Sequence, residues 1–511
     1  MLKHSPALAM AWVGPFGPLL AISPGAFAEP QKDAGVVTIT ASNPTSWPAQ
    51  IPATMEGLSA RQIEEQVNAS DSEDALKYLP SLLVRKRYIG DYNHAILSSR
   101  ASGTGNSARS AVYADGILLS NFLGNGVSGL GFPPRWGMVT PDEIERVDVM
   151  YGPFSAAYPG NSVGAVVDYT TRMPDRFEGS VKLGYTHQPF DLYNTHASYG
   201  SWQTSASLGS RAGDWAWRLD FHHSDSQSQP LTFANALRST TAANTADMAV
   251  TGAISGQNKL GQDWLLLGTG TQYHTVQDHF KAKLAYDLSP TLRATYTLAS
   301  WQNTSQGRST TYLRDAQGQP VYSGNVSIDG QRYTLNGGTF PLTQENLQHT
   351  LHGLSIKSRT QGSFDWEVAA SRYDYGTDEK RSNSGSNPLP AAATGGSGTI
   401  ADGSGTSWHN LALRGTWRPD GPKGEHVVDF GAQQDHYRLR YQTSNIAGNW
   451  PGDGASTLAS EVGGRTQLQS FYAQDTWRFA PLWRAVLGLR SEHWQASDGL
   501  TRFSASSSTG H

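Results

Sequence analysis

The feature that most restricts the fold of this chain is a set of short runs in which apolar and polar residues alternate. Apolar and aromatic residues alternate with polar ones over 215–222, and similar alternation occurs in 292–299, 364–370 and 485–489. A period of two residues predicts antiparallel strands with one apolar and one polar face. No run of about 18 or more apolar residues occurs, which excludes a bundle of transmembrane helices.

The connections between these predicted strands are short on one side and long on the other. Tight turns are expected at 211–214, 289–291, 361–362 and 480–481, and long polar loops at roughly 225–273, 302–347, 376–406 and 442–466. Long loops are uncommon in compact soluble domains, whereas this asymmetry is typical of outer-membrane barrels. A soluble β-sandwich and an autotransporter-like barrel stay open as alternatives for this region.

Composition narrows the class further. The chain has 54 Gly, 21 Tyr, 16 Phe and 15 Trp, which suits many strands, turns and aromatic girdles. Its formal net charge of −4 creates no field that attracts nucleic acid, so no nucleic-acid partner is expected. Because the chain has no cysteine, disulfides and thiolate sites are excluded.

The amino terminus has the features of a secretion signal. Lys3 and His4 precede a mostly apolar segment over 7–22, and Ala26-Phe27-Ala28 supplies a cleavage site of small residues. A hydrophobic anchor is the alternative, but prolines and glycines interrupt the segment, which is short for a spanning helix. We therefore expect a signal peptide over 1–28 and a mature chain that begins in an envelope compartment.

Residues 142–172 contain the densest set of structural signals. They predict, in order, a strand (144–151), a Gly-Pro turn (152–153), a short helical Ser-Ala-Ala segment, a Gly-Asn turn (160–161) and a second strand (163–171). Glycines supply backbone freedom at the turns, and valines favour the strands. A soluble sheet domain could use the same elements.

This segment resembles the last part of the plug domain of TonB-dependent outer-membrane receptors. We call the residues that match the family's pattern the plug motif. They are Arg100, Asp115, Gly116, Glu145, Gly152, Pro153, Gly160 and Gly164. Earlier segments also match the family, with a predicted helix over 71–79 that leads into Leu79-Pro80-Ser81 and a strand over 112–117. Residues 470–477 with 487–490 resemble a hairpin of the family's barrel.

The resemblance implies an N-terminal α+β plug domain followed by an antiparallel transmembrane β-barrel in the outer membrane of a Gram-negative cell. The expected division is a signal peptide (1–28), a TonB box with an N-terminal extension (29–43), a plug domain (44–176) and a partial barrel (177–511). About eleven strands are expected, the last ending near Trp494 before a Ser-rich loop at 506–511, against about 22 in the family. We therefore expect a truncated or split receptor. The backbone N–H and C=O groups at its open strand edges would find no hydrogen-bond partners in lipid.

The resemblance also implies a partner and a function. Residues Val36, Val37, Thr38, Ile39, Thr40 and Ala41 look like a TonB box, a β-prone segment that could add a strand to the sheet edge of TonB. An ordinary first plug strand is the alternative. The implied function is energised uptake of a scarce solute, with a ferric siderophore or similar chelate as the commonest family ligand, no cofactor and no catalytic residues.

Two plug segments are candidates for ligand contact because cationic and aromatic side chains suit anionic iron chelates. Their candidate residues are Arg85, Arg87 and Tyr88 in the first segment, and Phe122, Arg135 and Trp136 in the second. Solvated charge or packing between plug and barrel is the structural alternative for each. The chain also departs from the family: Tyr151 stands where an arginine often pairs with barrel acids, and Arg100 precedes Ala101 instead of glycine. The latch between plug and barrel is therefore in doubt.

Other functions have weaker support in the sequence. Histidine groups at 222–223, 274–279 and 349–352 lack identifiable carboxylate partners, so no fixed metal site is expected. A hydrolase barrel would need a nucleophile with a base, and no Gly-x-Ser-x-Gly elbow occurs, so no enzyme activity is expected. A non-transporting adhesive or structural barrel, or a non-functional receptor fragment, remains the alternative function.

Overall fold

A computed structural model describes residues 54–92, 96–100, 109–120, 122–124, 134–152, 155–504 and 506–510. The predicted signal peptide and TonB box lie outside these described residues. Within them, no helix combines the length and the apolar character needed to cross a membrane.

The first part of the described chain folds around a five-stranded sheet with the order β1-β6-β7-β4-β5. Strand β7 pairs antiparallel with β6 and parallel with β4. A separate two-stranded sheet joins β2 and β3. The elements are β1 (Thr54–Ser59), α1 (Ala60–Gln66), the 3-10 helix η1 (Ser72–Leu76), β2 (Leu82–Arg85), β3 (Ile96–Ser99), β4 (Ser110–Ala114), β5 (Ile117–Leu118), η2 (Trp136–Met138), η3 (Pro141–Glu143), β6 (Ile144–Tyr151), η4 (Gly160–Ser162) and β7 (Ala165–Thr171).

The predicted strands of this unit are confirmed, whereas its helices are shorter than expected. Strand 144–151 is β6, and strand 112–117 is the β4-β5 hairpin, whose turn places Asp115 and Gly116 at positive φ. The predicted helix over 71–79 is only a 3-10 turn, because Pro80 disfavours helical geometry at Leu79. The Ser-Ala-Ala segment is a turn rather than a helix.

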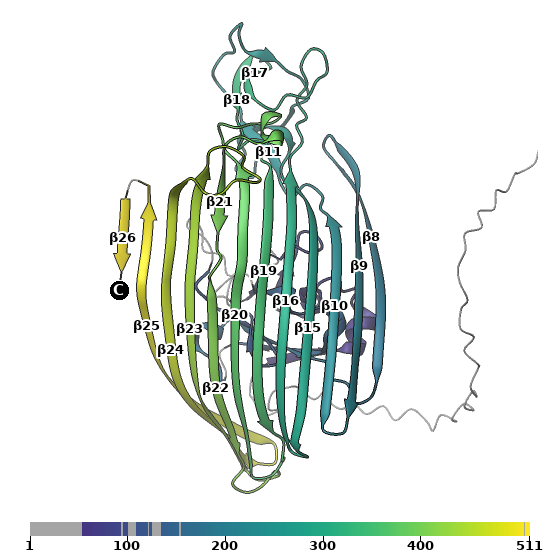
Figure 1. Ribbon diagram of the computed structural model, residues 1–511, viewed down its shortest axis with the longest axis vertical. Helices are drawn as coiled ribbons and strands as arrows, with labels where there is room; N and C mark the ends of the chain where they lie inside the picture. The colour runs from purple at the N-terminus through teal and green to yellow at the C-terminus, as the bar shows by residue number, and fades with distance from the viewer. Residues whose placement is uncertain are drawn as a thin grey trace, which may run out of the picture. The chain divides into compact units, whose positions relative to one another are not determined.

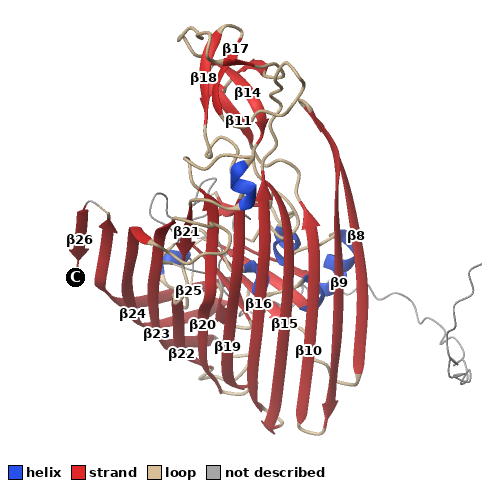
Figure 2. Ribbon diagram, turned by 45° about the horizontal axis from the view of Figure 1, so that its top comes forward, coloured by secondary structure: helices blue, strands red, loops and turns tan. Residues whose placement is uncertain are grey.

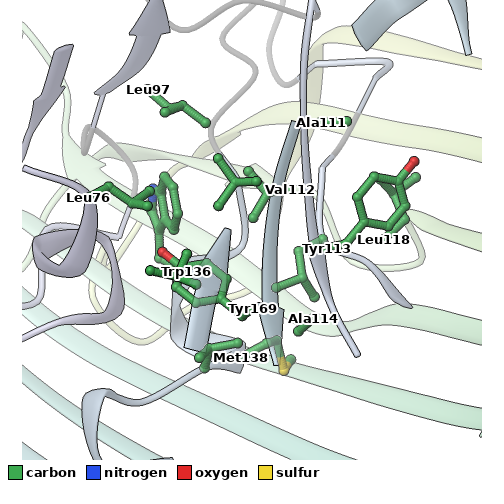
Figure 3. Close-up of a cluster of buried hydrophobic side chains, with 14 of the residues drawn as sticks. Leu76, Leu97, Ala111, Val112, Tyr113, Ala114, Leu118, Trp136, Met138 and Tyr169 are labelled. Atoms are coloured by element: carbon green, nitrogen blue, oxygen red, sulfur yellow. The ribbon is translucent and has the colours of Figure 1, made fainter. Parts of the chain in front are cut away.

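Apolar side chains from β4, β6 and β7 form the core of this unit. Val112, Val147 and Val167 are completely buried, and Figure 3 shows Val112 and Tyr169 among side chains contributed by η1, η2 and β4. The same core continues into Trp301, Tyr373 and Trp408 of the following region. The first unit therefore packs directly against the strands that come after it.

The second part of the chain forms a 13-stranded sheet, here called the large sheet. All its pairings are antiparallel, and the predicted tight turns connect its strands. Eleven of its strands are long, in agreement with the sequence-based expectation. The members are β8 (Glu178–Leu192), β9 (Thr195–Ala212), β10 (Trp215–Gln227), β15 (Gln272–Ser289), β16 (Leu292–Arg308), β19 (Thr343–Ser358), β20 (Phe364–Asn383), β21 (Gly398–Asp402), β22 (Ser407–Trp417), β23 (His426–Ile446), β24 (Thr457–Ala480), β25 (Trp483–Phe503) and β26 (Ser506–Gly510).

Two expectations about the last strands were wrong. The final long strand continues to Phe503 instead of ending near Trp494, because β24 offers backbone partners as far as Ser460. Residues 506–510 form β26 against β25 and not a loop. Within the described residues, the strand order runs from β8 to β26 without the two ends pairing, so the large sheet is open (Figures 1 and 2).

The long polar loops predicted at one end of the large sheet contain short strands and a 3-10 helix of their own. A second apolar core that includes Leu265, Leu313 and Phe340 holds two small sheets together above the strands (Figure 1). These apolar residues interrupt the polar segments and provide the core. The elements are β11 (Phe233–Leu237), β12 (Met248–Ala249), β13 (Ile254–Gln257), β14 (Asp263–Thr269), β17 (Gly324–Ile328), β18 (Gln331–Leu335) and, in a later loop, η5 (Ala391–Thr394).

The large sheet is inverted relative to a sheet of a soluble protein. On β10, Arg218 and Asp220 face the first unit and are only 3% and 4% exposed, whereas Leu219 and Phe221 are 40% and 44% exposed. The same inversion repeats on other strands, where apolar residues such as Leu413 and Phe471 lie outward. A sheet whose outer face is apolar and whose buried face is polar suits a lipid surrounding.

Charge on the outward face is therefore expected to be costly. We predict that Leu413→Arg destabilises the full-length protein in lipid bilayers by about 2–4 kcal/mol, because Leu413 lies between Leu411 and Trp417 in the band of outward apolar residues on β22. Urea-induced unfolding in liposomes would measure the free energy. The matched control is Leu260→Arg, since Leu260 is exposed in the turn between β13 and β14, outside the band. Equal destabilisation by both substitutions would contradict a lipid-facing Leu413.

Candidate functional site: the plug and the sheet face that covers it

The first candidate segment, 85–88, is held by acids of its own unit. The ammonium Nζ of Lys86 lies 2.6 Å from carboxylate oxygens of both Asp71 and Asp74. Burial lowers the pKa of Lys86, but the nearby carboxylates outweigh that effect and raise it overall. Lys86 is therefore a fixed cation inside the plug and not a free charge for a ligand.

Arg87 and Tyr88 occupy the loop side of the plug. Arg87 Nε lies 2.9 Å from Asp91 Oδ2, and the ring of Tyr88 stacks on Tyr273 at a centroid distance of 5.8 Å. Side chains at the loop end of β10 and just beyond it donate hydrogen bonds to backbone carbonyls, from Ser226 to Ile89 and from Gln229 to Arg87. These contacts fix the segment beside the loop ends of β10 and β15.

Arg85 differs from its neighbours because it is exposed. No ion pair of Arg85 occurs within the described ranges. Its guanidinium is therefore the most accessible cation of this segment for an anionic ligand.

The second candidate segment lies deeper. Arg135 and Trp136 are both buried, and the guanidinium carbon of Arg135 lies 5.0 Å from the centroid of the Tyr375 ring. The ring of Phe122 meets Tyr437 edge-on at 5.9 Å. This burial makes packing between the plug and the sheet the main role visible for Arg135 and Trp136, and their part in ligand binding stays a prediction.

A buried aromatic array extends from Tyr92 of the plug to Tyr375, the ring that Arg135 contacts. Its ring contacts run from Tyr92 to Trp301 (5.1 Å), from Trp301 to His349 (5.3 Å) and from His349 to Tyr375 (4.0 Å). The sequence analysis considered His349 only as a possible metal ligand and did not identify the other members, because Trp301 and Tyr375 are single aromatics among many on alternating strands and Tyr92 lies in a plug turn. Only the docking of the plug brings them together.

Two lysines of β15 form buried ion pairs with the plug. Lys281 Nζ lies 2.7 Å from Glu143 Oε2, with side chains 3% and 1% exposed, and Lys283 Nζ lies 2.9 Å from Asp115 Oδ2. Lys283 also donates a hydrogen bond of 2.7 Å to the hydroxyl of Thr171. We call Lys281, Lys283, Glu143 and Asp115 the lysine latch.

The two acids of the lysine latch respond to burial differently. Burial raises the pKa of Glu143, and Lys281 opposes that shift only in part. Burial also acts to raise the pKa of Asp115, but Lys283 and hydrogen bonds from Thr171 outweigh it and lower the pKa. Each lysine therefore favours the charged form of the carboxylate that it contacts.

The lysine latch joins the plug to the large sheet although Tyr151 replaces the arginine that often makes such a contact in the family. The hydroxyl of Tyr151 donates to Glu56 at 2.7 Å within the plug, so this residue makes no charged contact with the sheet. The charges are exchanged relative to the family pattern, because here the cations lie on the sheet and the acids lie on the plug. The spacing of two residues between Lys281 and Lys283, which places both on one face of a strand, is the sequence signal that could have indicated this contact.

Several residues of the plug motif have turn or close-approach roles. Gly152 adopts a φ of 86°, which glycine accepts without strain. A Cβ at Gly164 would lie 2.8 Å from the carbonyl oxygen of Arg109, so that position tolerates no side chain. The Gly160 amide donates to Glu492 of β25 at 3.3 Å.

The remaining motif residues lie at the surface or outside the described residues. Glu145 Oε2 lies 4.0 Å from Arg172 Nε in an exposed contact. Arg100 is exposed at the end of β3. Pro153 and the proposed TonB box, 36–41, lie outside the described residues. In the part of the chain that the structure describes, no group of three or more His, Cys, Asp or Glu could hold a metal ion.

Comparison with protein families identifies the first unit. Residues 48–166 match the family described as TonB-dependent Receptor Plug Domain. This range contains β1 to β6 and the first residues of β7, together with both acids of the lysine latch. No curated protein sequence matches the chain.

Solved structures share the fold at low sequence identity. The ferric citrate transporter FecA, unliganded, is 13% identical with a TM-score of 0.57, over 90% of this chain and 58% of that one. The ferripyoverdine receptor of Pseudomonas aeruginosa bound to ferripyoverdine is 13% identical with a TM-score of 0.54, over 91% and 54%. The siderophore receptor PirA from Acinetobacter baumannii is 13% identical with a TM-score of 0.52, over 88% and 57%. The chain therefore spans less than two thirds of the length of these structures.

Proposed function

Because its plug domain makes this chain a member of the TonB-dependent receptor family, we propose that the protein takes up a small solute across the outer membrane of a Gram-negative cell. It acts as a transport receptor and not as an enzyme. In this proposal the plug occupies residues 44–176, the membrane strands begin at 177, and TonB supplies the energy through residues 36–41.

One observation carries the proposal: a plug domain is packed against the polar face of a sheet whose opposite face is apolar. The polar residues that face the plug include Arg218, Asp220 and Gln277, and Gln277 donates to the carbonyl of Gly90 at 2.9 Å. In water such a sheet would bury its polar side and expose its apolar side at a large cost. An adhesive or structural barrel would have no need for the plug.

We further propose a ferric siderophore or similar anionic chelate as the solute. The structures with the same fold include a ferric citrate transporter and a ferripyoverdine receptor. The exposed cation Arg85, beside the loop-side residues Arg87 and Tyr88, suits an anionic ligand with aromatic groups. A transport screen of the full-length protein with iron chelates, haem, cobalamin and sugars would identify the class.

The TonB-dependent step is tested by deleting residues 36–42 from the full-length protein. We expect energised uptake of the labelled chelate to disappear while equilibrium binding to cells stays unchanged, because the segment pairs with TonB and not with the ligand. Deletion of 29–35, a segment of the same length, is the matched control and should leave uptake intact. Uptake that survives the deletion of 36–42 would refute this function for the segment.

A further inference from the structure

A cationic hollow lies on the outward face of the large sheet, on the side away from the plug. Its volume is about 650 Å³. Along β22 and β23, Trp408 and Tyr437 are buried toward the plug, so their neighbours His409, His436 and Arg438 point outward. The side chains that define the hollow are Arg372, His409, His436, Arg438, Arg465 and Gln467.

Like charges face each other in this hollow. Arg438 lies directly opposite Arg465 on β24, an arrangement that destabilises a sheet unless an anion is present. The rings of His409 and His436 stack beside them at 4.7 Å.

The acids nearby do not neutralise this cluster fully. Arg372 pairs with Asp374 at 2.6 Å, and Arg465 pairs with Asp498 at 3.2 Å, but both arginines are mostly exposed, so these pairs are weak. Arg438 makes no ion pair within the residues that the structure describes. The hollow therefore keeps an uncompensated positive charge.

The hollow lies at the edge of the apolar band. Below it on β22, Leu411, Leu413 and Trp417 are the outward side chains, and Phe430 and Phe471 flank them on β23 and β24. From Trp417 to His409 the strand rises about 26 Å at about 3.3 Å per residue, and with the usual strand tilt of about 35–45° this spans about 20 Å along the membrane normal, most of an apolar band about 25 Å tall. The cations therefore stand at the loop-side level of lipid headgroups.

We propose that the cationic hollow binds the phosphate-bearing headgroup of an anionic lipid in the loop-side leaflet. Two facing guanidinium groups can hold phosphate oxygens in forked hydrogen bonds, and the acyl chains would lie along Leu411, Phe430 and Phe471. Bound phosphate also removes the repulsion between Arg438 and Arg465. This inference rests on the proposed function, because that function supplies the membrane position of the sheet.

The test uses the full-length protein in neutral detergent, with added lipid A as the phosphorylated probe and dephosphorylated lipid A, phosphatidylcholine and inorganic phosphate as comparisons. We expect the wild type to retain lipid A through purification. The double variant Arg438→Gln with Arg465→Gln should bind it about tenfold more weakly, because charge-assisted hydrogen bonds are lost. Native mass spectrometry and titration would measure retention and affinity.

The matched control is Arg359→Gln, since Arg359 is an exposed arginine in a turn at the opposite end of the strands. Removing two facing cations is not expected to impair folding, and unchanged heat-modifiable migration would verify this. If the double variant fails this check, Arg438→Lys is used, which keeps the charge, removes the fork and is also expected to weaken binding. Equal affinity for dephosphorylated lipid A, equally tight binding of inorganic phosphate, or no effect of the arginine substitutions would overturn the proposal. The double variant should still take up solute, so a failed lipid site and a failed transport function give different results.

Discussion

Replacing Lys281 with methionine is expected to destabilise the docked plug by about 3–5 kcal/mol, because Glu143 would remain as a buried carboxylate without its cation. The backbone around Glu143 leaves it little room to move, since its Oε1 accepts a hydrogen bond of 2.6 Å from the Thr140 amide. We expect earlier plug unfolding in urea and faster proteolysis of the plug in the full-length protein. Adding Glu143→Gln should restore most of the stability, because it removes the unpaired charge.

The matched control for this substitution is Lys182→Met. Lys182 also joins the large sheet to a plug acid, with its Nζ 3.1 Å from Asp142 Oδ1, but this lysine is 59% exposed. An exposed pair contributes only about 0–1 kcal/mol, so the control should remain close to wild type. Equal losses from Lys281→Met and Lys182→Met would show that the buried pair has no special role.

The Lys281→Met defect should also depend on pH. Burial raises the pKa of Glu143 in the folded protein, and loss of Lys281 removes the main opposing effect. A carboxyl group whose pKa is raised in the folded state stabilises the fold at a pH below its unfolded-state pKa, which is about 4.3 for glutamate. This contribution is lost as the pH rises through the raised folded-state pKa. The variant should therefore approach wild-type stability in acid and lose the most at neutral pH. A defect of the same size at both pH values would contradict this assignment.

A polypeptide of residues 1–511 alone is expected to fail to insert as a closed monomer or to transport solute. Its large sheet has two open edges in the described structure, one along β8 and the other along β26 and the part of β25 that β26 does not cover. Each unsatisfied backbone group in hydrocarbon costs several kcal/mol, and each edge exposes several such groups.

Heat-modifiable migration of the membrane fraction on a gel is the measurement, with a closed outer-membrane barrel as the positive control. Residues 1–511 should migrate as unfolded protein without heating and should be degraded by protease. A compact, protease-resistant species formed by residues 1–511 alone would show that the two edges find partners, and the prediction would then be wrong.

The sequence by itself determined the local structure and the family of the first unit. Alternation over 215–222 and the turn residues of the hairpins specify strands and their connections, because side-chain period and backbone freedom at turns are local properties. Strand 144–151 and the Asp115-Gly116 turn were predicted for the same reason. The predicted helix over 71–79 was wrong because Pro80 limits its end and because tertiary contacts hold the rest of the segment: all of η1 is buried, and Asp74 pairs with Lys86.

Only the tertiary structure decided which residues meet across the plug and the large sheet. Alternation separates the faces of a strand, but the buried face is identified only when Arg218 and Asp220 are seen packed inward and Leu219 outward. The pairing of Lys281 with Glu143 joins residues 138 positions apart, as the difference 281 − 143 shows, and no local pattern encodes such a contact. The same applies to the arginines at 438 and 465, because cross-strand neighbours depend on register, and register is set by the pairing of whole strands.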